Sequence, residues 1–182
     1  MMPFKIKHKL RNKIRIEKTN QVQIGQNLKM NGCDISIKGQ NNLLTIGDNV
    51  NLRDVQIEIL GVNCKIDISD GVLIGRNSYL SAKEENILLS IGKNCNLSRN
   101  IKIMTSDGHK IIKNGERINL AKNIYIGENV WIADSVTILK GVNINSGTVL
   151  GINSTVVKDI EYNSIAVGNP CRVVTHDIKW EL

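Results

Sequence analysis

The chain has 182 residues, the length of one domain or of one domain with a small extension. Hydrophobic residues make up 41% of it but aromatic residues only 3%, so we expect a core of Ile, Val and Leu rather than one packed around large rings. The formal net charge is +7, and the sequence has neither a membrane-spanning run of ~18 apolar residues nor the apolar segment of a signal peptide, so we expect a cytoplasmic protein.

Basic residues concentrate at the start of the chain, in a lead that we place at residues 1–13. Lysine or arginine occupies alternate positions in this lead, at Lys5, Lys7, Lys9, Arg11 and Lys13, and the alternation continues to Arg15 just after it. We interpret the lead as a solvated approach to the first repeat, and peripheral attraction to an anionic surface is the alternative. Nucleic-acid binding is not expected, because no aromatic platform is interleaved with the basic residues.

The tetrapeptide Ile-Gly-x-Asn recurs along the chain. Its copies begin at Ile24, Ile46, Ile74, Ile91 and Ile126, and a relative begins at Leu150. The aliphatic residue is expected to point inward, Gly to begin a tight corner, and Asn to occupy a position with positive φ, which Asn tolerates better than most residues. Each copy is therefore predicted to form one corner of a repeating structure.

From residue 126 onward the hydrophobic pattern has a period of six. Every sixth residue is aliphatic: Ile126, Ile132, Ile138, Ile144, Leu150 and Val156. A small or β-branched residue follows each of the first five after four positions: Val130, Val136, Val142, Thr148 and Ser154. This spacing is typical of a solenoid that turns a corner every six residues. We predict an all-β parallel β-helix over residues 14–160.

The earlier copies are spaced irregularly, at 22, 28, 17 and 35 residues, which predicts loops that leave the solenoid at corners. The longest gap, from Ile91 to Ile126, predicts one extended loop at about residues 106–122, and loops on a rigid scaffold commonly carry functional residues. In this loop His109 follows Asp107 after two positions. A histidine oriented by a carboxylate can act as a general base near neutral pH, and a solvated loop histidine is the alternative.

Three further features lie in the later part of the chain. Trp131 is predicted to point outward from a flat face, where a large aromatic residue covers a ligand, a neighbouring subunit or another loop. Lys158 and Arg172 follow the regular repeats and are either phosphate clamps or plain surface charges. Residues 161–182 are expected to cap the open end of the solenoid as a short helix or strand, with Trp180 as an apolar anchor.

No metal site is expected. The four cysteines lie far apart and form no Cys-x-x-Cys pair, which argues against a zinc knuckle. Cys95 falls at the small inward position of its repeat, so we interpret it as a buried small hydrophobic residue.

Together these elements resemble the hexapeptide-repeat acyltransferase family over roughly residues 14–175. The resemblance is carried by the Ile-Gly-x-Asn repeats and by the segments Ser106–His109, Gly115–Asn119, Ile126–Ile132, Val156–Ile160 and Gly168–Val173. It is strongest to acetyl-CoA-dependent O-acetyltransferases that act on capsular or surface polysaccharides, including those of the sialic-acid type. The resemblance implies a left-handed β-helix that assembles as a homotrimer, with active sites between adjacent subunits and acetyl-CoA in the groove between two solenoids.

The resemblance also implies roles for single residues. His109 would take the proton from a hydroxyl of the saccharide acceptor, whose oxygen attacks the thioester directly, and Trp131 would lie near the reacting centre. The implied cofactor-binding positions are Ala133, Gly151, Ile152, Lys158 and Arg172. The sequence departs from the family pattern at Ala133, where Gly is frequent, and at Asp134, where a small neutral residue is common.

Other function classes stay open. One is an N-acetyltransferase acting on an amino-sugar nucleotide; such relatives usually carry a further N-terminal domain, and because the repeats begin near Ile14 we expect the O-acetyltransferase instead. Another is a non-catalytic structural solenoid, for which regular outward rows of Thr would be expected, and the upstream coils show none. A γ-class carbonic anhydrase would need several histidine ligands for zinc, whereas His8, His109 and His176 are scattered.

Overall fold

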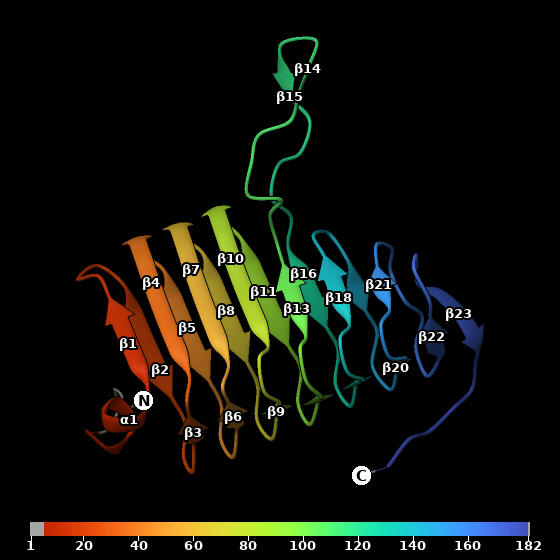
Figure 1. The fold of residues 1–182 in the computed structure, drawn as a ribbon, viewed down its shortest axis with the longest axis horizontal. Coiled ribbons are helices and arrows are strands. Elements are labelled where there is room, and N and C mark those ends of the chain that lie inside the picture. The colour runs from red at the N-terminus through yellow and green to blue at the C-terminus, as the bar shows by residue number, and fades with distance from the viewer. Residues whose placement is uncertain (1–5, 182) are drawn as a thin grey trace.

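The computed structural model describes residues 6–181, which form a parallel β-helix with three flat faces (Figure 1). The chain climbs the first face, turns, descends the second face and returns through the third while it advances along the axis (Figure 1). This winding is left-handed. The predicted fold class is therefore confirmed.

The strands of each face stack in register. The first face holds β1 (Lys13–Ile16), β4 (Asp34–Gln40), β7 (Gln56–Val62), β10 (Tyr79–Glu85), β13 (Lys102–Met104), β18 (Thr137–Leu139) and β21 (Thr155–Val156). The second face holds β2 (Gln21–Ile24), β5 (Leu43–Ile46), β8 (Lys65–Ile68), β11 (Leu88–Ile91), β16 (Ile124–Ile126) and β19 (Asn143–Ile144). The third face holds β3 (Lys29–Asn31), β6 (Asn51–Arg53), β9 (Leu73–Ile74), β12 (Asn96–Leu97), β17 (Trp131–Ile132), β20 (Val149–Leu150), β22 (Ile165–Val167) and the antiparallel β23 (Arg172–Thr175).

The core is a column of aliphatic side chains inside the solenoid. Every residue that the six-residue pattern places inward between 126 and 156 is buried. The two polar members of this set are satisfied by hydrogen bonds: Thr148 Oγ1 donates to Asn145 O (2.6 Å), and Ser154 Oγ accepts from Gly168 N (3.0 Å). Cys95 is also buried, as predicted, and burial raises the pKa of its thiol to about 12.

The corners have the backbone geometry that the repeats predict. The Asn of each Ile-Gly-x-Asn copy and of its relative has φ between 51° and 59°: Asn27, Asn49, Asn77, Asn94, Asn129 and Asn153. Their side chains hydrogen bond from coil to coil in places, as between Asn27 Nδ2 and Asn49 Oδ1 (3.1 Å).

The upstream coils differ from the prediction. The registers Asp34 to Gln56 and Gln56 to Tyr79 give coils of 22 and 23 residues, yet no loop leaves these coils within residues 6–104. The additional residues lengthen the strands instead, since β4, β7 and β10 each have seven residues and β13 has three. The expectation of corner loops is therefore wrong for these coils. The additional residues extend the strands of the first face, where their backbone groups pair with the neighbouring strands.

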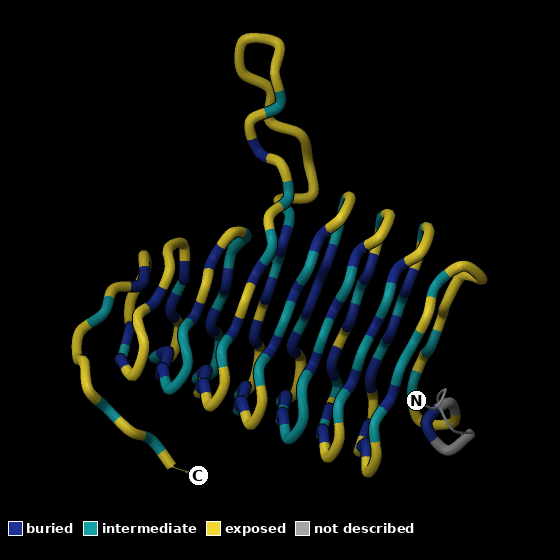
Figure 2. Tube along the Cα trace, turned by 180° about the vertical axis from the view of Figure 1, so that it is seen from behind, coloured by how far each residue is buried: buried dark blue, intermediate teal, exposed yellow. Residues whose placement is uncertain are grey.

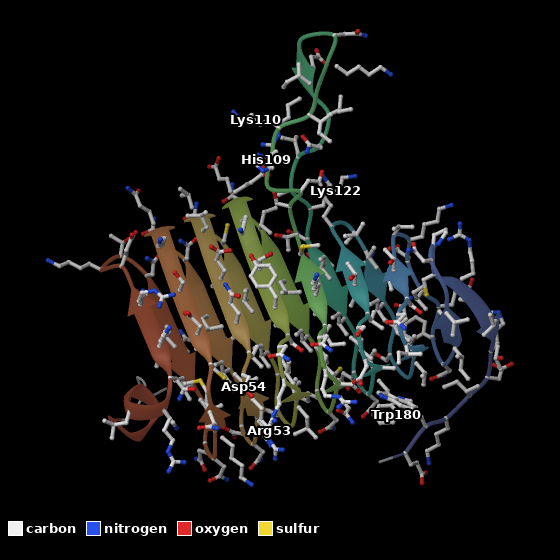
Figure 3. The ribbon with its side chains drawn as sticks, in the orientation of Figure 1. Arg53, Asp54, His109, Lys110, Lys122 and Trp180 are labelled. Carbon is white, nitrogen blue, oxygen red and sulfur yellow. The ribbon has the colours of Figure 1, made fainter. Side chains whose placement is uncertain are left out.

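The two ends of the solenoid are covered differently. Residues 1–5 of the basic lead lie outside the described residues, and the helix α1 (Ile6–Arg11) precedes β1. At the other end, β23 pairs with β22, and the tail that follows carries Trp180 (Figure 3). Within residues 6–181 no helix has the length and apolar character needed to cross a membrane.

Candidate active site

The chain leaves the solenoid between β13 and β16 as an arm, which we define as residues 105–123. The arm projects from the corner between the first and second faces, and its outer part is a hairpin of β14 (Ile112–Lys113) and β15 (Glu116–Arg117) (Figures 1 and 2). The loop predicted at about residues 106–122 therefore exists. His109 lies where the arm meets the body of the solenoid (Figure 3).

Glu84, near the end of β10, anchors the base of the arm. Its carboxylate accepts hydrogen bonds from Ser106 Oγ (2.7 Å) and from the guanidinium of Arg117 (2.5 Å). The Arg117 guanidinium holds the pKa of the Glu84 carboxyl below its ordinary value. One side chain of the solenoid thereby holds both the outgoing and the returning segment of the arm.

Asn119 fixes the backbone around His109. Its side-chain amide donates to the carbonyl oxygen of His109 (2.7 Å) and to Asp107 Oδ2 (2.9 Å), and its Oδ1 accepts from Ile111 N (2.7 Å). Asn119 is buried, although most of the other residues of the arm are exposed. The side chain of Asn119 therefore holds together the short backbone segment that carries the imidazole.

Asp107 is engaged by groups other than the imidazole. Its Oδ2 lies 2.5 Å from Lys140 Nζ, and this contact is the main reason that the pKa of Asp107 is lowered. Within residues 6–181 no group hydrogen bonds to the imidazole of His109, which is exposed. The carboxylate holds the loop in place, and the imidazole nitrogens stay open to an incoming proton donor.

The sequence did not assign roles to Glu84, Lys140 or Asn119. Asn119 lies in the segment Gly115–Asn119 that contributed to the family resemblance, so that segment was the available signal. Glu84 carried no local signal, because its partner Arg117 is 33 residues further along the chain.

Trp131 lies on the third face, away from the arm. Its side chain is 39% exposed and packs against Trp180, whose indole N–H donates to Asn129 O (2.7 Å). Figure 3 shows His109 at one edge of the solenoid and Trp180 at the opposite edge. One chain therefore does not bring His109 and Trp131 together.

The predicted cofactor-binding residues fall at different corners. Ala133 and Gly151 follow the paired residues Ile132 and Leu150, so they stack at the corner between the third and first faces. A Cβ on Gly151 would lie 2.5 Å from Val167 Cγ1, so only Gly fits without rearrangement.

Of the other three predicted positions, Ile152 lies at this corner and Lys158 lies at a different one. Ile152 follows Gly151 and is 63% exposed. Lys158 lies at the corner between the first and second faces, because Thr155 pairs with Thr137 and places Lys158 in line with Lys140. Arg172 begins β23, where one of its guanidinium nitrogens donates to Cys171 O (2.8 Å).

Asp134, which departs from the family pattern, forms an ion pair within the solenoid. Its Oδ2 accepts from Arg99 Nε (3.0 Å) and Nη2 (2.5 Å), and its Oδ1 accepts from the backbone N–H of Arg99 (2.8 Å). The pKa of Asp134 is accordingly lowered by Arg99. The charge at position 134 is thus balanced by the preceding coil. No group of three or more potential metal ligands lies together among residues 6–181.

No family model matches the chain, but curated proteins and solved structures do. It is 37% identical over 107 residues to the galactoside O-acetyltransferase of Escherichia coli K12, a match that covers 56% of this chain and 52% of the relative. It is 33% identical over 115 residues to the polysialic acid O-acetyltransferase of Escherichia coli O1:K1, covering 60% and 38%. The chain spans about half the length, or less, of these curated relatives.

The structural matches extend over most of the chain. The polysialic acid O-acetyltransferase OatWY superposes with a TM-score of 0.71 and 30% identity, over 94% of this chain and 90% of that one. The polySia-specific acetyltransferase NeuO gives a TM-score of 0.71 and 27% identity, over 94% and 89%. The N-acyltransferase AntD from Bacillus cereus, solved with dTDP and coenzyme A, shares the fold with a TM-score of 0.67 and 20% identity, over 85% and 83%.

Proposed function

Because the chain belongs to the hexapeptide-repeat acyltransferase family, we propose that it transfers an acetyl group from acetyl-CoA to a hydroxyl of a surface or capsular polysaccharide or of its sugar precursor. The proposal is carried by one observation: His109 is exposed at the base of a fixed loop, in a chain that aligns with OatWY over nearly its whole length.

The proposed chemistry needs one proton acceptor and no covalent enzyme intermediate. The imidazole of His109 takes the proton of the acceptor hydroxyl as its oxygen attacks the thioester carbonyl carbon. The carbon–sulfur bond then breaks, and the departing thiolate receives that proton from the imidazolium. General-base assistance of this kind typically contributes ~10²–10⁴ in rate.

The residues at the corner between the third and first faces fit the co-substrate. Ala133 and Gly151 are small and partly exposed there, which leaves room for an extended pantetheine arm, and Ile152 offers an exposed apolar side chain beside them. Arg172 is an exposed cation that suits the phosphates, and Lys158, an exposed cation at the corner between the first and second faces, would reach them from an adjacent subunit. On this arrangement we assign all five residues to binding acetyl-CoA.

We further propose a homotrimer in which His109 of one subunit meets Trp131 of the next. Within one chain His109 lies at the edge opposite Trp180 (Figure 3), and Trp180 is the residue against which Trp131 packs. The arm also carries four large aliphatic side chains that are 51–59% exposed in one chain: Ile111, Ile112, Ile118 and Leu120. A neighbouring subunit would bury this apolar surface.

The activity is tested with acetyl-CoA and candidate oligosaccharides, analysed by mass spectrometry. We expect the gain of one acetyl group that is removed by mild base, as an ester is; a base-stable acetyl group would indicate N-acetylation instead. The variant His109→Ala should lose at least ~10²-fold in kcat, and His176→Ala, at an exposed histidine of the tail, should retain activity. Undiminished turnover of His109→Ala contradicts the mechanism.

The shared site is tested by mixing subunits. His109→Ala and Trp131→Ala are each expected to be inactive alone. After dissociation and reassembly in equal amounts, about a quarter of the interfaces would combine an intact His109 with an intact Trp131. Recovery of activity in the mixture supports a site between subunits, and no recovery, or a monomeric mass in light scattering, contradicts it.

A further inference from the structure

A concavity of about 460 Å³ opens on the third face, upstream of the corner at Ala133, where we place the thioester end of the pantetheine arm. It lies over β6, β9 and β12, and this volume is within the ~300–1,000 Å³ range typical of small-molecule sites. Its lining includes Gly75 and Ser98 and three charged residues, Arg53, Arg99 and Asp134. Nothing in the acetyl-CoA assignment above uses these residues.

No side chain occupies the edge of the concavity where Gly75 begins the corner toward the first face. A Cβ on Gly75 would lie 2.1 Å from the carbonyl oxygen of Ser98, so no side chain fits there without rearrangement. The register of the strands puts Arg53, Gly75, Ser98 and Ala133 in one row. Three strand spacings of ~4.8 Å separate Arg53 from Ala133 along this row, or about 14 Å, which leaves room for a sugar between them.

The lining carries one unbalanced positive charge. Arg99 is neutralised by Asp134 through two contacts of its guanidinium. Arg53 is exposed and forms no ion pair with any residue in the range 6–181. An arginine in this state presents a planar array of donors that matches a carboxylate in a bidentate manner.

The remaining lining groups suit a sugar ring. Asn51 and Asn96 bring side-chain amides to the concavity, and Ser98 brings a hydroxyl, which together can pair with ring hydroxyls. Leu73 supplies the apolar surface on which a ring face can rest. The combination of one cation, neutral polar groups and one apolar side chain favours a singly charged saccharide over a neutral one or a polyphosphate.

We propose that this concavity binds the acceptor as a carboxylate-bearing sugar, with its carboxylate on Arg53 and its reactive hydroxyl directed along the row toward Ala133. The inference rests on the proposed function for the location of the thioester. It adds the charge class of the acceptor and the residue that recognises it.

The test compares a short sialic acid oligomer with the same oligomer after its carboxylates are reduced to alcohols. We expect Arg53→Gln to raise KM for the acidic oligomer roughly 10- to 100-fold, the effect of losing a charge-assisted hydrogen bond, and to leave KM for acetyl-CoA unchanged. Arg53→Lys should fall between the two, because it keeps the charge but not the bidentate geometry. Lys18→Gln, which removes a charge from an exposed residue elsewhere, is the matched control.

Equal effects of Arg53→Gln on the acidic and reduced oligomers, or no effect on either, would overturn the proposal. Binding of the acidic oligomer without acetyl-CoA, measured by saturation-transfer NMR, separates its failure from that of the proposed function. If the acidic oligomer binds in a way that depends on Arg53 but no acetyl group is transferred, the saccharide site is supported and the proposed acetyltransferase function is contradicted. If a neutral galactoside is acetylated and the acidic oligomer does not bind, the function is supported and the saccharide site is contradicted.

Discussion

Trp180 packs its indole ring on Trp131, with the ring centroids 6.1 Å apart and the planes tilted by 44°. The tail that carries Trp180 is fixed by two backbone contacts, from Ile178 N to Asn163 O (2.9 Å) and from the indole N–H to Asn129 O (2.7 Å). A cavity of about 500 Å³ lies beneath this tail. The last residues of the chain therefore hold the aromatic side chain that we place in the active site.

The first prediction concerns Trp180→Ala. We expect a loss of roughly 0.5–1.5 kcal/mol from the aromatic pair, in addition to the area exposed, and a red shift in the fluorescence of Trp131 as water reaches its ring. Urea unfolding and emission spectra measure the two effects. Lys179→Ala is the control, because its ion pair with Glu181 is largely exposed and contributes little. Unchanged emission from Trp131 would show that the tail does not cover it.

The second prediction concerns Asn119→Ala. The variant loses the hydrogen bonds to His109 O, Asp107 and Ile111 N, so the backbone segment that carries the imidazole is no longer held in one place. We expect kcat to fall by up to ~10²-fold, as small displacements of catalytic groups do, while KM for acetyl-CoA and the melting temperature of the solenoid stay as they were. Lys113→Ala, on the exposed hairpin, should change none of these quantities. A rise in KM without a fall in kcat argues against a positioning role.

The third prediction concerns Glu84→Gly. Glu84 has φ of 86° and stacks on Gly39 and Gly61 in the preceding coils, so its backbone is in a region that favours glycine. Glycine relieves this strain, but it also removes the carboxylate that holds Ser106 and Arg117. We expect faster amide hydrogen exchange in the arm and no fall in the unfolding midpoint of the solenoid.

The neighbouring residue provides the control for this variant. Glu85→Gln changes an exposed side chain and should leave exchange in the arm unaltered. If the arm of Glu84→Gly exchanges as slowly as before, the anchoring role of the carboxylate is wrong.

The difference between the predictable and the unpredictable parts follows from the range of the interactions. Between residues 126 and 156 the six-residue period determines which side chains point inward, and each of these predictions depends only on residues close together in the sequence. Further upstream, Ile68 pairs with Ile46 and Ile91 but begins Ile-Ser-Asp-Gly, and Gly71 takes the positive φ (70°) that Asn takes elsewhere. This additional copy of the repeat accounts for much of the irregular spacing that, in the sequence alone, predicts loops.

The site shows the same division. His109 and Trp131 were conspicuous as rare residue types at defined points of the repeat. The pairs Glu84–Arg117 and Trp131–Trp180 join residues 33 and 49 positions apart, and they form only because the arm and the tail fold back onto the solenoid. Sequence patterns of short period carry no information on such contacts.

The fourth prediction separates packing from binding at Gly151. A methyl group there would lie 2.5 Å from Val167 Cγ1, so Gly151→Ala should cost roughly 1–3 kcal/mol in unfolding free energy, as overpacking does. Val167 is 37% exposed, so Val167→Ala alone should cost little, and the double variant should regain most of the lost stability. Urea unfolding of the three variants measures the coupling, and strictly additive effects would contradict the predicted contact. If Gly151 also gives the pantetheine arm access to the backbone, the double variant will be stable and still show a raised KM for acetyl-CoA, because relief of the internal clash does not remove the added methyl group from the corner.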